Sequence, residues 1–449
     1  MPFRFFLILS ALVVCVSSLN AQNINRNEEE REEMKRRMEI LQRMMKTDPE
    51  GTRDSLRKAS LLAKKEKAKQ RIEEYQHHLN ISEVTKIDLS NGDFTTVPEF
   101  VFKAVKLEEL ILDDNEISRL PRELKNLSNL KMIRWSHNEL STKRIKIPKL
   151  TGIETFHLYG NKLSKLPNLK RLKNVKKLYI GGNKFPTIPV KRLRKLKNLH
   201  ELSLARNPLV LGKEKYSKLS GLKKLGLIFC EIDSVHPSFY QLHGLTELVL
   251  AENKLTHLSD GISGLSSLVN LSLYKNKLED LPSDIGELKK LEEIDLYYNN
   301  LEVIPPAVGD LDNLKVLYLS YNKIYDLPEE IGNLSNLREL YVHHNRLSFI
   351  PEGISRLNQL KVLHFQENFM PEFPYQILGM KSIRDLDISF TEIRVLPLGI
   401  EKMELENFYY KDLDIDLLHS DNDEARAMIM RMLDRGTNCN PRIYEEGAE

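Results

Sequence analysis

The chain of 449 residues contains only three cysteines, and one of them, Cys15, lies in an apolar N-terminal run. The other two, Cys230 and Cys439, are too few for a disulfide-stabilised module. Stability must therefore come from a hydrophobic core. The hydrophobic fraction of the sequence, 41%, is in the range of ordinary globular proteins. The length exceeds that of a usual single compact core, which indicates several domains or an array of repeats.

Motifs of catalysis and of cofactor binding are also missing from the sequence. It has no Gly-rich phosphate loop, no nucleophile elbow, and neither an HExxH nor a CxxC pair. The segments outside the repeats described below are too short for a separate catalytic domain. We therefore expect a protein that is not an enzyme, with no catalytic residues and no cofactor.

Long apolar runs are confined to the N-terminus, where Arg4 precedes an apolar stretch from Phe5 to Val16 and small residues end at Ala21. This pattern predicts a cleaved secretory signal peptide over residues 1–21, and hence export to the medium, periplasm or cell surface. An uncleaved N-terminal anchor is the alternative. The run is too short for an ordinary membrane span, and no second one follows, so no span is expected in the mature chain.

A repeat dominates the rest of the sequence. The pattern L-x-x-L-x-L-x-x-N-x-L-x-x-L-P begins fourteen times from Val84 to Ile383, spaced 23 residues apart except for one 22 and one 24. Leucines at positions 1, 4 and 6 are expected to face inward from a short strand, each worth roughly 1.5–3 kcal/mol when buried. The period and consensus resemble the leucine-rich repeat family, in its 23-residue type with a following L-P-x-x-[IL]-x-x-L segment.

The resemblance covers residues 84 to about 408 and implies an α/β solenoid, a leucine-rich repeat horseshoe with a parallel concave β-sheet. Repeats 3, 6, 7 and 8 lack the proline, so the least regular convex turns are expected around residues 140–150 and 209–262. The family's cysteine caps are missing, which favours a bacterial exported protein.

Both ends of the array need a cap. Residues 22–83 predict a charged helical hairpin, whose second helix runs to about Leu79. Its first helix places four apolar residues on one face, Met34, Met38, Leu41 and Met45. A coiled-coil dimerisation arm is the alternative for this segment. Residues 409–449 predict a C-terminal cap helix over 420–435 followed by a loose tail. The apolar residues expected to cover the last repeat are Ala427, Ile429, Met430 and Leu433.

Position 9 of the repeat is asparagine in eleven of the fourteen repeats, with Gly92, Cys230 and Thr391 as the exceptions. Because the amide both donates and accepts, we expect it to satisfy backbone groups of its own turn and of the next one. Cys230 is accordingly interpreted as a buried member of this row. The predicted structural asparagine ladder comprises Asn115, Asn138, Asn161, Asn183, Asn207, Asn253, Asn276, Asn299, Asn322, Asn345 and Asn368.

Outward positions of the expected strands carry clustered aromatic residues. In this family positions 3, 5, 7 and 8 of the repeat face the concave side. Tyrosine clustered with histidine on such a face is typical of binding surfaces, whereas cross-strand pairing that merely stabilises the sheet is the alternative. We predict a partner-binding face that comprises Tyr274, Tyr297, Tyr298, Tyr318, Tyr321, Tyr341, His343, His344, His364 and Phe390.

Two further groups of residues share the concave positions. A lesser aromatic patch lies in repeats 4 and 5, and an apolar stretch follows it. These groups comprise His157, Tyr159 and Tyr179, and then Ile228, Phe229, Val249 and Ala251. No metal is expected at the histidines, because His343 and His344 are consecutive and point differently, and no tight ligand spacing is present.

Charge is distributed unevenly along the chain. Residues 143–224 contain 23 Lys+Arg and 3 Asp+Glu, a net of +20, whereas residues 225–449 contain 20 and 38, a net of −18. Such a block can attract an anionic surface polymer or remain a solvated face without a ligand. Nucleic acid is not expected, since no aromatic residues interleave with the lysines.

The function that this sequence predicts is non-enzymatic recognition of a protein partner on the concave tyrosine-rich face. One alternative is an adhesion or envelope-surface protein that binds anionic polymers through the basic block of residues 143–224. The other is an intracellular signalling scaffold, which applies if residues 1–21 are not a signal peptide.

Overall fold

The computed structural model describes residues 49–77, 80–141, 147–411, 413 and 423–439. The expected signal peptide and the first helix of the expected hairpin lie outside these residues. The chain divides into two compact units, Met1–Arg71 with Ile443–Glu449, and Ile72–Arg442. Within the described residues, no helix combines the length and the hydropathy needed to cross a membrane.

Helix α3 (Pro49–His77) begins in the first unit and ends in the second. In the second unit, its last turn places Ile72 and Tyr75 against the core of the repeats. The Tyr75 ring lies 6.5 Å from that of Phe100. Its hydroxyl accepts a hydrogen bond from the backbone N–H of Asp88 at 3.3 Å. The end of α3 therefore covers apolar surface of the first repeat.

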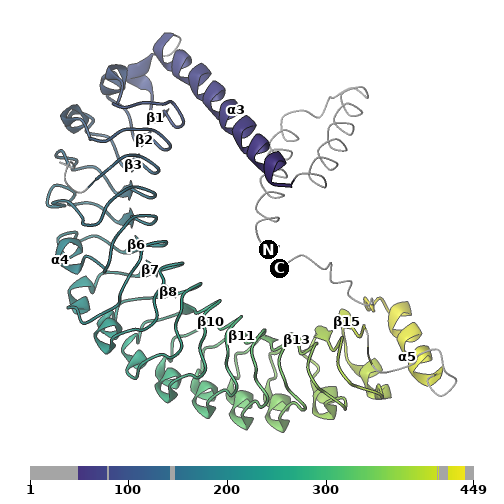
Figure 1. The fold of residues 1–449 in the computed structure, drawn as a ribbon. Helices are drawn as coiled ribbons and strands as arrows, with labels where there is room; N and C mark the ends of the chain where they lie inside the picture. Colours follow the sequence, from purple (N-terminus) through teal and green to yellow (C-terminus); the bar gives the residue numbers. More distant parts are fainter. Residues whose placement is uncertain (1–48, 78–79, 142–146, 412, 414–422, 440–449) are drawn as a thin grey trace, which may run out of the picture. The chain divides into compact units, whose positions relative to one another are not determined.

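All strands of the second unit belong to one parallel sheet, which confirms the expected α/β solenoid. Fifteen three-residue strands follow one another in chain order within the described residues. Figure 1 shows them on the inner side of the arc of repeats and the short helices on its outer side. The strands are β1 (Lys86–Asp88), β2 (Glu109–Ile111), β3 (Met132–Arg134), β4 (Thr155–His157), β5 (Lys177–Tyr179), β6 (Glu201–Ser203), β7 (Lys224–Gly226), β8 (Glu247–Val249), β9 (Asn270–Ser272), β10 (Glu293–Asp295), β11 (Val316–Tyr318), β12 (Glu339–Tyr341), β13 (Val362–His364), β14 (Asp385–Asp387) and β15 (Asn407–Tyr409).

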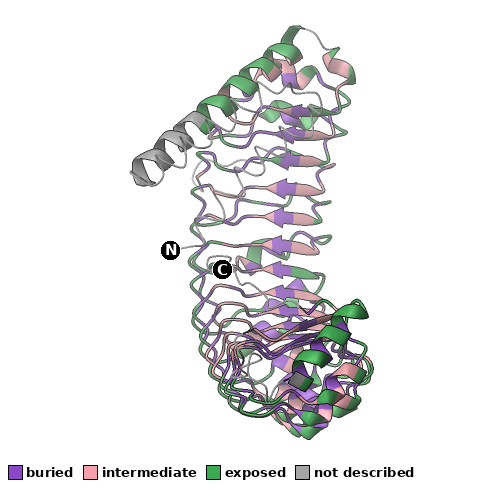
Figure 2. Ribbon diagram, turned by 90° about the vertical axis from the view of Figure 1, so that its right-hand side faces the viewer, coloured by how far each residue is buried: buried purple, intermediate pink, exposed green. Residues whose placement is uncertain are grey.

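The register pairs equivalent positions of successive repeats, for example Tyr318 with Tyr341. Each strand occupies positions 3 to 5 of its repeat, and its middle residue is buried, as Figure 2 shows by the purple centre of most strands. Leu317 and Leu319 of repeat 11 are 1% and 0% exposed. The inward leucines therefore form one continuous core between the sheet and the outer turns.

Asparagines at position 9 link each turn to the one before it. The Nδ2 group of Asn322 donates to the carbonyl oxygens of Leu296 and Leu319, both at 2.9 Å, and its Oδ1 accepts from the N–H of Leu301 at 3.0 Å. The sequence-based expectation of bonds to the next turn was wrong, because the partners outside the asparagine's own turn lie in the preceding turn. Cys230 takes the same place, with Sγ 3.3 Å from the carbonyl oxygen of Leu204.

The convex side carries short helices, most of them 3-10 helices that begin after the repeat's proline. Residues 209–262 are more regular than expected, since η4, η5 and the first residue of η6 lie there without that proline. The buried residues Tyr216, Phe239 and Ile262 anchor these turns instead. The helices are η1 (Ile81–Glu83), η2 (Glu99–Lys103), η3 (Arg122–Asn126), α4 (Val190–Leu193), η4 (Tyr216–Leu219), η5 (Pro237–Gln241), η6 (Ile262–Gly264), η7 (Ser283–Glu287), η8 (Pro306–Asp310), η9 (Glu329–Asn333), η10 (Glu352–Arg356), η11 (Tyr375–Gly379) and η12 (Leu398–Lys402).

The C-terminal end differs from the sequence-based expectation in two ways. A fifteenth strand, β15, follows the fourteen recognised repeats; Phe408 fills its buried leucine position and Tyr410 the next one. The tail is not loose at its start, since the N–H of Asn438 donates to the Glu406 carbonyl at 2.8 Å and Cys439 is 4% exposed. Residues just after α5 (Asp423–Asp434) thus cover the edge of the sheet.

Helix α5 buries a different stripe from the one predicted. Met430 and Leu433 are 55% and 42% exposed, and Ala427 is exposed as well, so that part of the prediction was wrong. A helical face recurs every three to four residues, and Ile429 is the one predicted residue that lies on the buried face. Its partners there are Ala425, Met428 and Met432. Arg431 bonds Glu401 of η12 at 2.8 Å.

Candidate binding surface on the concave sheet

Position 8 of repeats 10 to 12 forms a column of stacked rings. The ring centroids of Tyr298 and Tyr321 are 4.2 Å apart with an interplanar angle of 28°. Those of Tyr321 and His344 are 3.8 Å apart at 27°. Parallel strands lie about 4.8 Å apart, so equivalent side chains of successive repeats come to stacking distance without any adjustment of the backbone.

Opposite charges close the two ends of this column. The Nζ of Lys275 lies 5.1 Å from the centroid of the Tyr298 ring, a cation–π contact. At the other end, Glu367 Oε2 is 2.6 Å from His344 Nδ1. Lys275 and Glu367 also occupy position 8. Along repeats 9 to 13, this one position therefore carries a cation, three rings and an anion in that order. We call these five residues, Lys275, Tyr298, Tyr321, His344 and Glu367, the position-8 column.

Position 7 adds a second row of rings beside the column. Tyr297 is central, with ring centroids 5.0 Å from Tyr321 and 4.8 Å from Tyr298. Tyr274 stacks against Tyr297 at 6.0 Å from one side, and His343 approaches it edge-on at 5.8 Å. The Nδ1 of His343 lies 2.8 Å from the Ser320 hydroxyl. The two rows therefore form one continuous aromatic surface across repeats 9 to 12.

Position 5 forms a further stack at the ends of β11, β12 and β13. Tyr318 and Tyr341 are 5.0 Å apart with rings nearly parallel, at 10°, and the His364 ring meets Tyr341 edge-on at 5.2 Å. The Tyr341 hydroxyl donates to the Glu339 carboxylate at 2.8 Å. Burial, together with this acceptor, raises the pKa of Tyr341 well above its ordinary value, so the phenol is held protonated as a donor.

The predicted binding residues are more covered than an open face implies. The tyrosines, His343, His344 and Phe390 are half-buried by one another, because each ring lies against its neighbours. His364 is only 5% exposed, and its Nε2 bonds Asp385 at 2.7 Å. Phe390 lies under the Lys411 ammonium, 5.3 Å from the ring centroid. His364 consequently supports the surface from beneath.

Backbone conformation sets position 8 apart from the rest of the repeat. In all fourteen repeats that follow the consensus, this residue has a positive φ, between +50° and +67°. Only Gly160 and Gly182 are glycines; Tyr298, Tyr321 and His344 adopt φ of 57°, 55° and 50°. The left-handed region costs L-residues about 1–2 kcal/mol each. Ring side chains at these positions are thus retained against a local conformational cost.

The histidines of this surface bind other side chains and do not converge on one point. Within the described residues, no group of three or more His, Cys, Asp or Glu side chains is arranged to hold a metal ion. His344 bonds Glu367 and His364 bonds Asp385, whereas His343 bonds Ser320. Each of these partners lies in the next or the preceding repeat, an offset that is readable from the 23-residue period.

The lesser patch in repeats 4 and 5 is a separate cluster. His157 and Tyr179 stack at 4.3 Å and 16°, and the Tyr179 hydroxyl donates to Glu201. Burial, aided by the charge of Arg134, lowers the pKa of His157. Tyr159 contacts the ring of His137 edge-on at 5.3 Å. These contacts leave the histidine neutral at physiological pH and tie adjacent strands together.

The predicted apolar stretch between the two patches is only partly exposed. Ala251 is 6% exposed, while Ile228 and Val249 are half-buried. Phe229 is 39% exposed, and the Arg206 guanidinium lies 4.5 Å from the centroid of its ring. Arg206 and Phe229 both occupy position 8, so the same column that stacks tyrosines in repeats 10 to 12 here pairs a cation with a ring.

Two family models match the sequence. The model described as "Leucine-rich repeat region" matches residues 307–397, and the model described as "Leucine rich repeat" matches residues 82–140, 220–278 and 266–324. Together these matches cover more than half of the chain. They include strands β1 to β3 and β7 to β14 of the sheet.

Known proteins resemble this chain in sequence or in fold. Osteomodulin of Rattus norvegicus is 28% identical over 160 residues, which cover 34% of this chain and 37% of osteomodulin. A leucine-rich repeat protein of Leptospira interrogans superposes with a TM-score of 0.55 at 24% identity, covering 82% of this chain and 98% of that one. The glycosylated Toll–Spatzle complex of Drosophila gives a TM-score of 0.64 at 20% identity over 76% of this chain and 52% of that one.

The chain spans just over a third of the length of osteomodulin, and the likeness to the solved structures establishes the fold alone. The parallel strands and the buried leucines recur along the residues that these models match. The chain belongs to the leucine-rich repeat family.

Proposed function

We propose that this chain is a non-enzymatic recognition module that binds a protein partner on the concave aromatic surface formed by repeats 9 to 13. The observation that carries the proposal is the set of rings at position 8. Tyr298, Tyr321 and His344 occupy left-handed backbone positions that glycine fills more readily, as at Gly160 and Gly182. Side chains held against such a cost are typical of functional surfaces.

The composition of the surface suits a protein ligand. Tyrosine combines a large apolar ring with a hydroxyl, and it is enriched among the residues that dominate protein–protein binding. Lys275 and Glu367 supply opposite charges at the two ends, which would fix the orientation of a partner. The Toll–Spatzle complex, whose fold is similar to that of this chain, contains Toll bound to Spatzle. This similarity of fold supports the proposal and does not identify a partner.

Ring stacking within the sheet is the competing explanation. Cross-strand aromatic pairs stabilise a sheet by about 0.2–1 kcal/mol each, and the 4.2 Å and 3.8 Å contacts of Tyr321 satisfy that role. Pairing alone, however, is available at position 5 on strand residues such as Tyr318 and Tyr341, without any left-handed backbone. The left-handed backbone is shared by position 8 of all fourteen repeats, so what distinguishes repeats 10 to 12 is that rings follow one another at this position.

We infer in addition that the chain is exported, from the charge and hydropathy pattern of residues 1–21. An intracellular scaffold is the alternative. Sequencing the N-terminus of the natural protein distinguishes the two: a start at Gln22 in an exported fraction supports export, and an intact Met1 in the cytoplasm contradicts it.

The test of partner binding compares two sets of four aromatic substitutions in affinity capture from cell-envelope and medium extracts. The first variant carries Tyr297→Ala, Tyr298→Ala, Tyr321→Ala and Tyr341→Ala on the concave surface. The matched control carries alanine at four aromatics outside it, Tyr325, Phe349, Phe369 and Tyr375, which are 53%, 51%, 57% and 57% exposed. The control side chains are more exposed than the concave ones. Nonspecific hydrophobic binding would therefore be reduced more in the control variant than in the concave variant.

We expect a captured protein to be lost from the concave variant, with affinity reduced about 100-fold or more, and retained by the control. Capture should persist at high salt, because ring contacts are not screened. Equal capture by both variants, or loss only in the control, would contradict the proposal. Circular dichroism of both variants checks that the sheet is intact.

A further inference from the structure

A second surface lies on the convex side of repeats 5 to 7, within residues 143–224, whose net charge is +20. Helix α4, drawn on the outer side of the arc in Figure 1, begins this region, and η4 and η5 follow in the next two repeats. Nine cationic residues from Lys191 to Lys218 are exposed, and all but Arg206, which lies on the concave side, belong to this surface: Lys191, Arg192, Arg194, Lys195, Lys197, Arg206, Lys213, Lys215 and Lys218.

These repeats lack the glycine that allows the convex turns to approach closely elsewhere. In repeats 10 and 11, a Cβ on Gly309 or Gly332 would lie 2.3 Å or 2.1 Å from the carbonyl oxygen of the next turn. Only glycine permits such an approach. The corresponding residues in repeats 5, 6 and 7 are Arg194, Ser217 and Tyr240. The glycine that permits this approach is therefore missing from these three repeats.

A groove on this surface has a volume of about 630 Å³ and is lined by five cations and a single carboxylate, that of Glu214. Neutral polar groups are supplied by Ser238 and Gln241, and Val190 adds an apolar contact. The five cations are exposed, and none of them forms an ion pair with a carboxylate in the described part of the chain. They are Lys191, Arg194, Lys213, Lys215 and Lys218.

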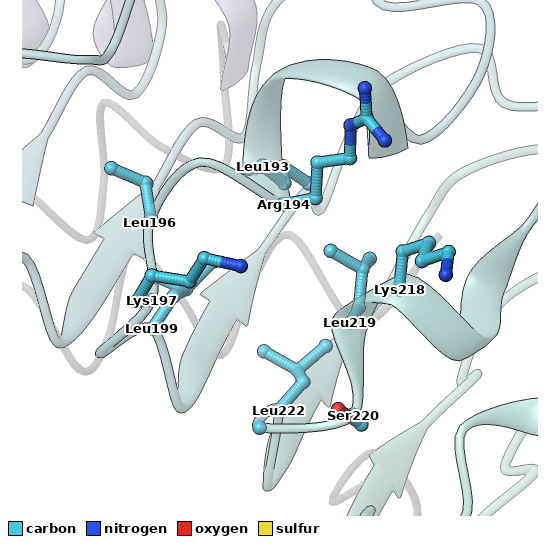
Figure 3. Close-up of a pocket in the computed structure, with 10 residues that line it drawn as sticks. Leu193, Arg194, Leu196, Lys197, Leu199, Lys218, Leu219, Ser220 and Leu222 are labelled. Atoms are coloured by element: carbon cyan, nitrogen blue, oxygen red, sulfur yellow. The ribbon is translucent and has the colours of Figure 1, made fainter.

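A smaller hollow continues the groove, since Arg194 and Lys218 line both. Its volume is about 90 Å³, and its apolar floor comes from leucines of the same two repeats. Figure 3 shows Arg194 and Lys197 on the segment that follows α4, and Lys218 on η4, on either side of that floor. The cations therefore form an extended row across two repeats.

We propose that this convex groove binds a linear anionic polysaccharide, one that carries sulfate or carboxylate groups along its length. Unpaired cations of one sign repel one another and attract a polyanion. Their extended, exposed arrangement matches charges that repeat along a chain, whereas a single phosphate would need a buried, convergent site. None of the residues lining either hollow is aromatic, so the stacking platforms that hold nucleic acid bases are missing.

The hydroxyl of Ser238 and the amide of Gln241 add neutral polar groups beside the cations, and the hydroxyl also lies 3.0 Å from His236 Nδ1. Ser238 Oγ accepts a hydrogen bond from the backbone N–H of Glu214 at 3.2 Å, which positions the hydroxyl beside the cations. Sugar hydroxyls bond such neutral groups between the charged contacts. The groove is separate from the concave aromatic surface, so the two proposals succeed or fail independently.

The test measures binding of full-length protein to immobilised heparin, used as a sulfated polysaccharide probe, against neutral dextran. The groove variant carries Lys191→Gln, Lys213→Gln, Lys215→Gln and Lys218→Gln. A control variant with the same change in net charge carries glutamine at Lys290, Lys361, Lys381 and Lys402, all exposed. A third variant with arginine at the four groove positions preserves their charge and shows that the site tolerates substitution.

We expect heparin to bind the natural and the arginine chains and the control alike, and the groove variant about tenfold or more weakly. Binding should fall steeply with salt, and it should survive the four concave alanine substitutions. Equal weakening in the groove and control variants would show that net charge alone acts, and would overturn the proposal. So would no binding of heparin, or tighter groove-dependent binding of duplex DNA or of vesicles that contain anionic lipid.

Discussion

Substituting Tyr321 by alanine and by glycine tests whether position 8 is conformationally costly. Glycine is usually the more damaging replacement in an ordered segment, by roughly 0.5–1 kcal/mol relative to alanine. At Tyr321 the φ angle is 55°, a region that alanine occupies at a cost of about 1–2 kcal/mol and glycine does not. At this position the glycine variant should therefore be more stable than the alanine variant, the reverse of the usual order.

The contacts of Tyr321 set the total loss. Both variants remove two stacked ring pairs, at 4.2 Å to Tyr298 and 3.8 Å to His344, each worth about 0.5–1.5 kcal/mol. We expect Tyr321→Ala to lower the free energy of unfolding by about 2–3 kcal/mol. Tyr321→Gly should be about 0.5–1 kcal/mol more stable than Tyr321→Ala, the relief of strain less the extra chain entropy.

Tyr318 provides the matched control. Its ring also stacks on a neighbouring ring, that of Tyr341, but its backbone is that of a strand, because it is the last residue of β11. There the usual order should hold, with Tyr318→Gly about 0.5–1 kcal/mol less stable than Tyr318→Ala. Urea denaturation of the four variants, followed by circular dichroism at 25 °C, gives the comparison. An alanine variant at Tyr321 that is more stable than the glycine variant would refute the argument from backbone cost.

Three further predictions concern buried groups. Asn299→Ala should lower the free energy of unfolding by about 2–4 kcal/mol, since its amide bonds three backbone groups at 3.0 Å; exposed Asn126→Ala should change it by less than about 0.5 kcal/mol. Burial lowers the pKa of His157, so the unfolded chain takes up that proton first as pH falls through about 6.5. Unfolding measured between pH 7 and 5 should therefore show a smaller loss of stability in His157→Gln; an unchanged slope would contradict this. Burial raises the pKa of Cys230 to about 11, so iodoacetamide at pH 8 should label it only after denaturation; rapid labelling of the native protein, seen by peptide mass spectrometry, would contradict the burial.

The solenoid was predictable because its signal is periodic. Leucines at fixed offsets over fourteen repeats specify both the strand and its inward face, and the structure places them in one core. The fifteenth strand was missed because Phe408 and Tyr410 replace the consensus leucines and Leu413 replaces the asparagine. Burial of these residues depends on packing against the neighbouring repeat and α5. Such packing cannot be seen in the repeat pattern of the sequence.

Features that depend on angle or on neighbours were harder to predict. The buried stripe of α5 was assigned to the wrong residues because a short helix with seven apolar residues offers more than one face. The aromatic positions were readable from the repeat, yet the left-handed backbone beneath Tyr298 and Tyr321 was not, since tyrosine ordinarily avoids it. The groove on the convex side lies where glycine is replaced, and these replacements gain meaning only once the close packing at Gly309 and Gly332 is seen.

Site-specific photocrosslinking tests the central claim most directly. A photoreactive phenylalanine analogue replaces Tyr297, at the centre of the concave aromatic surface, or Tyr325, which is 53% exposed and lies outside it. The account predicts that a partner recovered by affinity capture becomes covalently attached through position 297 and not through position 325. Attachment through position 325 alone would contradict it, and the binding face would have to be sought elsewhere on the repeats.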